Sequence, residues 1–445
     1  MITAPNSYPR PASASPIDLV ALVAFSIAPL VALYQGVAAA LGFLFVFDDL
    51  TASLTPAAVI AGTVVIRLTS LRNSFAFASV RRATLYLTGY LLVLLASTAL
   101  VYLDPIERDP DKMMLQLLGT AAPCLVFLVM VSSPSARASL RALGFSLLIW
   151  AAAAILTPLS ALTPLPIGEV QGAFAGSQGV RSFGVLGDGG TFVVSTLVVV
   201  FFVARRFFWF TLGLLALILS GSRGPLIVAA AGIGMAMVLS TPGVARQRPG
   251  ARAIRVVVAS VVAASLLVAI QVVFKALSEL FGANDALSRI TETEFTQTDR
   301  FFSIVQGLEW VQLSPIYGNG FNSYYYYALR AAAFGANESN ALNQIVQTLV
   351  DGGVIALLFL TLFFFETLRP GHGTMVDRRN DPYGLRISLV VFLILNQSAV
   401  YIGLISPLTI LVFGLAGAAL FLRETGAAAM RSQMSRPPAV LAPVR

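Results

Sequence analysis

Long apolar segments separated by short polar ones recur along the whole chain. A helix needs about 20 predominantly apolar residues to cross a bilayer. The clearest candidates are residues 83–103, 113–132, 142–160, 256–277, 341–366 and 386–404. Shorter candidates are residues 191–204, 207–220, 225–240 and 409–422. Residues 17–47 form either one long helix or two short ones, and an apolar segment at 55–71 follows. The pattern predicts about 12 transmembrane helices, with 13 as the alternative.

Composition supports the same class of protein. Hydrophobic residues make up 57% of the 445-residue chain and charged residues only 11%, against about 25% charged residues in a soluble domain. The expected fold is therefore an all-α polytopic integral membrane protein whose surroundings are the lipid bilayer.

The distribution of charge predicts how the chain is oriented. Residues 67–82 and 241–255 each contain four arginines and no acid, and the tail 423–445 contains four arginines and one glutamate. Because lysine and arginine are enriched in cytoplasmic loops, these segments are expected to be cytoplasmic. Residues 104–112 and 278–340 contain more acids than bases and are expected outside. The net charge of +8 is then a topology signal, and no nucleic-acid partner is expected.

The predicted organisation has three parts: a flexible cytoplasmic N-terminus at 1–16, a membrane domain at 17–422 and a cytoplasmic tail at 423–445. Two outward loops, 161–190 and 278–340, are long enough to carry chemistry.

The second loop is predicted to contain an amphipathic helix. Its apolar face is formed by residues that recur at helical spacing, namely Phe301, Ile304, Val305, Leu308 and Val311. Such a helix is suited to lie flat on the membrane surface. A turn and the tyrosines 324–327 follow, and these tyrosines suit either an interfacial aromatic belt or a sugar-stacking platform.

Several kinds of site are not expected. The chain has one cysteine, Cys124, and one histidine, His372, so no disulfide and no metal site built from cysteine and histidine is predicted. The stretch "SGSRG" (220–224) differs from the G-x-S-x-G pattern of a serine nucleophile. No cofactor is expected.

Three arginines, Arg181, Arg223 and Arg300, lie at predicted outer helix ends. Each is either an interfacial anchor or part of an anion pocket, because a guanidinium offers a fixed fork of donors to phosphate oxygens. The otherwise acidic outer loops favour the pocket.

Polar residues also precede the segment at 341–366. Glu338 either interacts with the helix dipole or has a chemical role, and Ser339 or Asn340 is suited to cap the helix. Asn340 and Asn343 are candidate substrate contacts.

The order "RSFG", "SGSRG", "SPIYGNGFNSY" and "NQIVQTLVDGGVIALL" resembles the O-antigen ligase and O-antigen polymerase superfamily over about residues 175–370. When Asn343 is aligned with the family's asparagine, Leu342 stands where ligases have a histidine. The resemblance therefore favours a polymerase of O-antigen or exopolysaccharide repeat units, with a ligase as the alternative. A transporter of lipid-linked glycans without catalysis is an alternative from another class.

The resemblance implies a metal-independent, GT-C-like membrane glycosyltransferase that acts at the periplasmic face of the bacterial inner membrane. Its substrate would be an oligosaccharide linked to undecaprenyl pyrophosphate, and a chain-length regulator is a candidate partner. Arg181 and Arg300 would contact the pyrophosphate with support from Arg223, and Glu338 would act as base. Tyr324, Asn340 and Asn343 would contact the sugars.

Overall fold

In the computed structural model, most of the membrane-like segments are described. The described residues are 17–40, 49–102, 110–133, 136–160, 169–171, 181–184, 186, 190–219, 223–239, 299–321, 323–324, 327, 343–369, 384–386 and 407–434.

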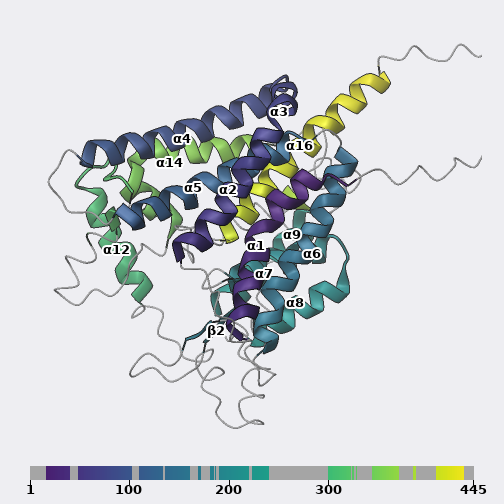
Figure 1. Ribbon diagram of the computed structural model, residues 1–445, viewed down its shortest axis with the longest axis horizontal. Coiled ribbons are helices and arrows are strands. Elements are labelled where there is room, and N and C mark those ends of the chain that lie inside the picture. The colour runs from purple at the N-terminus through teal and green to yellow at the C-terminus, as the bar shows by residue number, and fades with distance from the viewer. Residues whose placement is uncertain are drawn as a thin grey trace, which may run out of the picture.

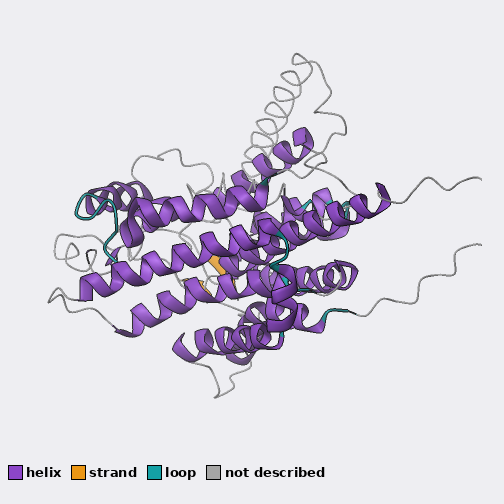
Figure 2. Cartoon of the chain, turned by 90° about the horizontal axis from the view of Figure 1, so that it is seen from above, coloured by secondary structure: helices purple, strands orange, loops and turns teal. Residues whose placement is uncertain are grey.

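This part of the chain is almost entirely helical (Figure 2). Its helices are α1 Leu19–Ala40, α2 Asp49–Ile66, α3 Leu68–Ser74, α4 Ala78–Tyr102, α5 Pro110–Val131, α6 Ala136–Ser160, α7 Gly190–Val203, α8 Phe207–Leu219, α9 Arg223–Leu239, α12 Asp299–Val311, α14 Gln344–Leu368 and α16 Pro407–Met434. Two short strands, β1 Glu169–Gln171 and β2 Arg181–Gly184, pair antiparallel. The predicted helical class is confirmed.

Within the described part of the chain, four helical segments are long and apolar enough to cross a membrane: Ala78–Leu100, Ala138–Ile155, Gln344–Leu368 and Leu408–Thr425. The bent pair α2 and α3 makes a fifth if it is counted as one span. The predicted segments 256–277 and 386–404 lie outside the described residues. The total of 12 spans therefore stays a prediction.

Two differences from the predicted helix boundaries concern α2 with α3 and α16. The segment at 55–71 is not one straight helix, because α2 and α3 meet at Arg67 with a bend of 68°. Helix α16 continues past residue 422 to Met434 and extends beyond the other helices (Figure 1). Its last part contains alanine, methionine, arginine and glutamine, which are good helix formers. The predicted start of the tail at residue 423 is therefore the end of the apolar residues and not the end of the helix.

Helices α4 and α14 lie side by side and antiparallel (Figure 1). Gly89 of α4 faces the ring of Phe359 so closely that a Cβ would lie 2.6 Å from it. In the same way, Gly414 of α16 faces the ring of Phe25 on α1, with a Cβ at 2.1 Å. Small residues at such points let membrane helices approach one another closely.

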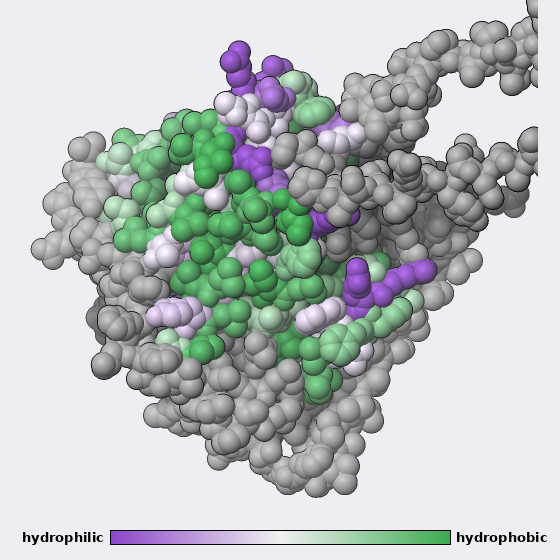
Figure 3. Space-filling view, turned by 45° about the vertical axis from the view of Figure 1, so that its right-hand side comes forward, coloured by the Kyte–Doolittle hydropathy of each residue, from purple (hydrophilic) through white to green (hydrophobic). Residues whose placement is uncertain are grey.

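The core and the outer surface of the bundle are both apolar. Helix α16 is buried from Leu408 to Leu422, as expected for a helix surrounded by others. Large exposed hydrophobic residues lie on the peripheral helices, among them Ile66, Leu85 and Phe365. Apolar surface covers a wide part of the face in Figure 3, and such a surface is suited to lipid.

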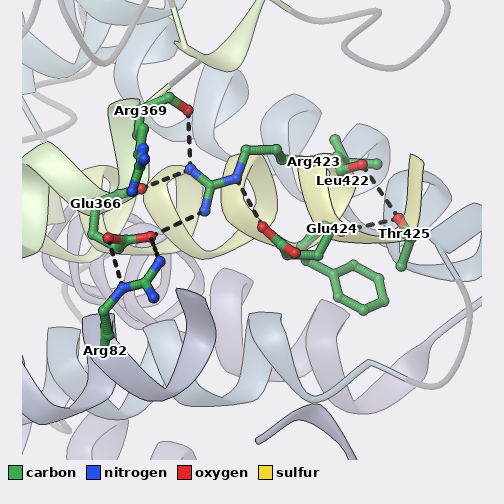
Figure 4. Close-up of polar contacts among 8 residues, drawn as sticks. Arg82, Glu366, Arg369, Leu422, Arg423, Glu424 and Thr425 are labelled. Atoms are coloured by element: carbon green, nitrogen blue, oxygen red, sulfur yellow. Dashed lines mark hydrogen bonds and ion pairs between the residues drawn. The ribbon is translucent and has the colours of Figure 1, made fainter. Parts of the chain in front are cut away.

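Polar contacts tie the helices together at the end of the bundle that carries α3. Glu366 of α14 accepts two hydrogen bonds from Arg82 of α4, at 2.9 and 3.1 Å. Arg423 of α16 contacts the same carboxylate at 3.4 Å and donates to the main-chain carbonyls of Glu366 and Arg369, at 2.8 and 2.9 Å (Figure 4). These contacts join the arginine-rich segment 67–82 to the start of the tail.

A second group at this end joins three segments. Arg67 forms an ion pair with Asp18, and Ser133 donates to the other oxygen of the same carboxylate at 2.6 Å. Asp18 also accepts from the main-chain N–H of Ala21 at 3.1 Å, which caps α1.

Candidate functional site

Helix α14 is broken in its first half, at the opposite end of the bundle from α3. Gly353 has φ of +64° and ψ of −167°, a conformation that is essentially restricted to glycine. In a continuous helix, the N–H groups of Val354 and Ile355 would donate to the carbonyls of Val350 and Asp351. At this break, both pairs are separated.

A turn formed by residues 314–321, here called the docked turn, replaces these partners. The carbonyls of Pro315 and Ile316 accept from the two N–H groups of α14, at 2.9 and 3.3 Å. The N–H groups of Asn319 and Gly320 donate to the two carbonyls of α14, both at 2.7 Å. Irregular backbone is tolerated at membrane depth only where its polar groups are satisfied. The exchange therefore allows a helix break within an apolar segment.

Glycines make this close approach possible. A Cβ on Gly353 would lie 2.2 Å from the carbonyl oxygen of Ile316. A Cβ on Gly318, whose φ is +75°, would lie 2.4 Å from the main-chain nitrogen of Gly352. The sequence elements "YGNG" and "DGG" are thus two sides of one main-chain contact.

Helix α4 holds the docked turn from another side. The hydroxyl of Ser97 donates to the carbonyl of Tyr317. The hydroxyl oxygen of Thr98 accepts from the N–H of Phe321 at 2.8 Å. Gly320 packs on the same turn of α4, where a Cβ would lie 2.7 Å from the Cα of Thr98. The docked turn is therefore fixed by both α4 and α14.

An aromatic cluster follows the docked turn. The ring of Tyr324 lies edge-on to Trp310 with their centroids 4.6 Å apart, and Tyr327 lies 5.4 Å from the same indole. Tyr324 also packs on Val346 and Val350 and is 0% exposed. For Tyr324 this disfavours the stacking platform, because a fully buried ring offers no exposed face to a sugar; Tyr325 and Tyr326 lie outside the described residues. The run of tyrosines in the sequence did not indicate which of them are buried.

The predicted amphipathic helix in the second loop is present as α12, Asp299–Val311. Ile304 and Val311 face the cluster around Tyr324. Val305 and Leu308 are 39% and 46% exposed, so the apolar face is only partly covered by protein. The uncovered part is suited to contact lipid.

Helix α14 begins at residue 344, three residues after the predicted start. Its cap is Asn343, whose Oδ1 accepts from the N–H groups of Ile345 at 2.9 Å and Val346 at 3.2 Å. The expectation that Ser339 or Asn340 caps this helix was therefore wrong. Because Oδ1 of Asn343 is engaged in the cap, the amide nitrogen is the group suited to a substrate contact.

A buried carboxylate lies inside the same helix. Oδ2 of Asp351 accepts from Gln347 of α14 and from Gln116 of α5, both at 2.8 Å, and Asp351 is 4% exposed. Ionisable residues within membrane spans are costly and usually functional. Sequence reasoning missed Asp351, although an acid inside a predicted span, directly before two glycines, was a usable signal.

The structure describes the main chain of the three candidate arginines. Arg181 lies on β2, paired with Gln171, and β2 contacts α6 and α7. Arg223 is the first residue of α9, which packs on α7. Arg300 is the second residue of α12, which packs on α14. Glu338 and Asn340 lie outside the described residues.

Two of these arginines lie in the first turn of a helix. The positive end of the helix dipole lies at the N-terminus, where acids are favoured and cations disfavoured by a few tenths of a kcal/mol. Helix α9 nevertheless begins with Arg223 and has no acid in its first turn, and α12 carries Arg300 in its first turn. In α12, however, the residue before Arg300 is Asp299, an acid at the first position of the helix, so of the two helices only α9 begins without an acid.

Comparison with known proteins bears on this region. Residues 207–361 match the model of a family described as O-antigen ligase. The match supports the similarity of the chain to the O-antigen ligase and O-antigen polymerase superfamily. The match runs from the start of α8 into α14 and contains Arg223, Arg300 and Asn343 together with the docked turn. Arg181 lies before it. Comparison with curated proteins finds no match.

The match supports a membrane enzyme of lipid-linked glycan transfer. The matched residues include all of the contact between "YGNG" and "DGG". The part of the chain that carries the superfamily signal is therefore also the part in which a helix break, a buried carboxylate and a docked turn meet.

Proposed function

We propose that the protein polymerises O-antigen or exopolysaccharide repeat units at the periplasmic face of the inner membrane. It would transfer a glycan from undecaprenyl pyrophosphate to a sugar hydroxyl of another lipid-linked repeat unit. The superfamily match supports glycan transfer. The choice of a polymerase over a ligase rests on Leu342, which stands where the resembling ligases have a histidine.

The proposed reaction is a single displacement. The acceptor hydroxyl oxygen forms a bond to the anomeric carbon of the donor, and the bond from that carbon to the phosphate oxygen breaks. The electron pair leaves with the lipid pyrophosphate, and the hydroxyl proton passes to Glu338 as general base. Arg181 and Arg300, supported by Arg223, stabilise the negative charge that develops on the pyrophosphate.

The structural support is the placement of cations at helix starts. Main-chain N–H groups in the first turn of a helix have no intrahelical partner, and together with the dipole they favour an anion. Arg223 and Arg300 add guanidinium donors at two such positions. With these donors, the proposal requires no divalent metal, and transfer by the purified protein should continue in the presence of a chelator.

The family description, O-antigen ligase, favours a second candidate, in which the acceptor is lipid A core. Both candidates use the same donor and the same leaving group. They differ in the acceptor, so the acceptor is what an experiment must identify.

Replacement of arginine by lysine tests the anion site. Lysine keeps a cation that is able to snorkel but loses the planar pair of donors. Loss of one such donor typically lowers the rate by about 10²–10³-fold. Arg181→Lys and Arg300→Lys should therefore leave repeat units largely unpolymerised in a deletion strain, at normal protein level.

The matched control is Arg206→Lys, because Arg206 is exposed in the turn before α8 and should tolerate the change. Full-length glycan ladders from both test variants would indicate that Arg181 and Arg300 anchor the protein in the membrane and do not bind pyrophosphate.

A further inference from the structure

One side chain in the docked turn joins two helices that carry proposed site residues. Asn319 is 5% exposed, and its Nδ2 donates to the carbonyl of Trp310 at 3.2 Å and to that of Val350 at 3.3 Å. Its main-chain N–H donates to the same Val350 carbonyl at 2.7 Å. Its Oδ1 accepts from the hydroxyl of Tyr327 at 3.4 Å. A single asparagine thus contacts both helices and the aromatic cluster.

The two carbonyls that Asn319 contacts lie where the regular helical hydrogen bonding is interrupted. Trp310 lies in the last turn of α12, where carbonyls lack the donor four residues on, and its carbonyl accepts from the N–H of Leu313 at 3.1 Å as well as from Asn319. Val350 lies just before the break, where the N–H of Val354 has turned away to Pro315. The amide of Asn319 therefore connects the end of α12 to the break of α14.

The other contacts between these helices are mostly apolar. Ile304, Trp310 and Val311 of α12 pack on Val346 and Val350 of α14, with Tyr324 among them. Apolar packing is not directional, and it allows one helix to rotate or slide on another with small loss. Hydrogen bonds are directional, so the side-chain amide of Asn319 restricts both the rotation of α12 about its own axis and its sliding along α14.

We infer that Asn319 is a positioning residue for glycan transfer: it ties α12 to α14 and so sets where Arg300 lies relative to Asn343. The inference rests on the proposed function, because Arg300 is assigned there to the pyrophosphate and Asn343 to a sugar. A misplacement of about 1 Å at a reacting group is able to cost about 10²-fold in rate.

The distance between α12 and α14 is directly measurable. Cys124 is the only cysteine in the chain and is buried, so Cys124→Ala provides a cysteine-free parent. Leu308 on α12 and Ile345 on α14 are 46% and 41% exposed, and cysteines at these two positions accept spin labels without disturbing the core. Pulsed electron paramagnetic resonance then gives the distribution of distances between the labels.

Two variants remove the bridge in different ways. Asn319→Asp keeps the size of the side chain but places an oxygen where the donor was. Asn319→Ala removes the side chain and keeps the main-chain N–H, so it decides the question if the aspartate variant does not fold. The matched control is Asn73→Ala, because Asn73 is exposed on α3 at the other end of the bundle.

Both Asn319 variants should broaden or shift the distance between the labels, while Asn73→Ala should not. The same variants should lower kcat by about 10²-fold and leave KM close to that of the parent, because the site is misplaced and not removed. A general loss of folding would instead lower the amount of active protein and leave the distance in the folded fraction unchanged.

Two outcomes would overturn the inference: unchanged distances in both variants, whatever their turnover, or a changed distance with normal turnover. If the parent protein itself transferred no glycan, the proposed function would fail, whereas the distances would still decide whether Asn319 ties α12 to α14.

Discussion

The contact between Gly353 and the docked turn gives the sharpest stability prediction. Gly353→Ala should destabilise the protein strongly, for two separate reasons. The backbone conformation at this residue, with φ of +64°, is strained for any residue with a Cβ. In addition, the new Cβ would lie 2.2 Å from the oxygen and 2.4 Å from the carbon of the Ile316 carbonyl, so the docked turn must move.

The expected cost follows from these two effects. A non-glycine residue in this conformation costs about 1–3 kcal/mol. Moving the turn weakens the hydrogen bonds from Asn319 and Gly320 to α14, now 2.7 Å each, at roughly 1 kcal/mol per bond. The sum is about 3–5 kcal/mol, which is large for a single substitution.

Gly62→Ala is the matched control. Gly62 lies inside α2, and a Cβ there would meet no atom within 4 Å. Since alanine is the better helix former by about 1 kcal/mol, this variant should be as stable as the parent or slightly more so. Thermal unfolding of both variants in detergent, followed by loss of the monodisperse peak, compares their Tm values. Equal Tm values for Gly353→Ala and Gly62→Ala would refute the described contact.

Three further predictions concern buried polar groups and topology. Glu366→Gln should destabilise by about 1.5–3 kcal/mol because Arg82 loses its charged acceptor, while Arg423 (7% exposed) keeps Glu424 and two main-chain carbonyls. Glu309→Gln at an exposed position should have little effect on Tm. Asp351→Leu should cost roughly 2–4 kcal/mol because the amides of Gln116 and Gln347 lose their common acceptor. Asp351→Asn keeps an accepting oxygen and should cost less. Equal Tm values for these two variants would contradict the hydrogen-bond role of Asp351. A cysteine at position 250 in the Cys124→Ala parent should be labelled only from the cytoplasmic side, and labelling from outside would reverse the predicted orientation.

The positions of most helices were predictable because crossing a bilayer imposes a length and a polarity. The segments predicted at 83–103, 113–132 and 207–220 correspond to α4, α5 and α8 within a few residues. Helix ends were less predictable, since they depend on local capping and on residues beyond the apolar part. Asn343 caps α14, and α16 continues through helix-forming residues to Met434.

The internal structure of the site was not predictable from apolar periodicity. The pattern at 341–366 is that of one continuous span, and the break at Gly353 exists only because the docked turn supplies partners for the separated groups. The burial of Tyr324 likewise depends on Trp310, which is distant in the pattern but adjacent in space. Arg181, Arg223 and Arg300 were recognisable as candidates because cations are unexpected in acidic loops that are predicted to lie outside.

The most direct test of the proposed function uses the whole protein in liposomes with a single substrate. Repeat units linked to undecaprenyl pyrophosphate are supplied as both donor and acceptor, without lipid A core. A polymerase should release undecaprenyl pyrophosphate and form lipid-linked glycans of two or more repeat units. Glycan transfer that occurs only after lipid A core is added would contradict the proposal and identify a ligase, and movement of the glycan across the bilayer without bond formation would identify a transporter.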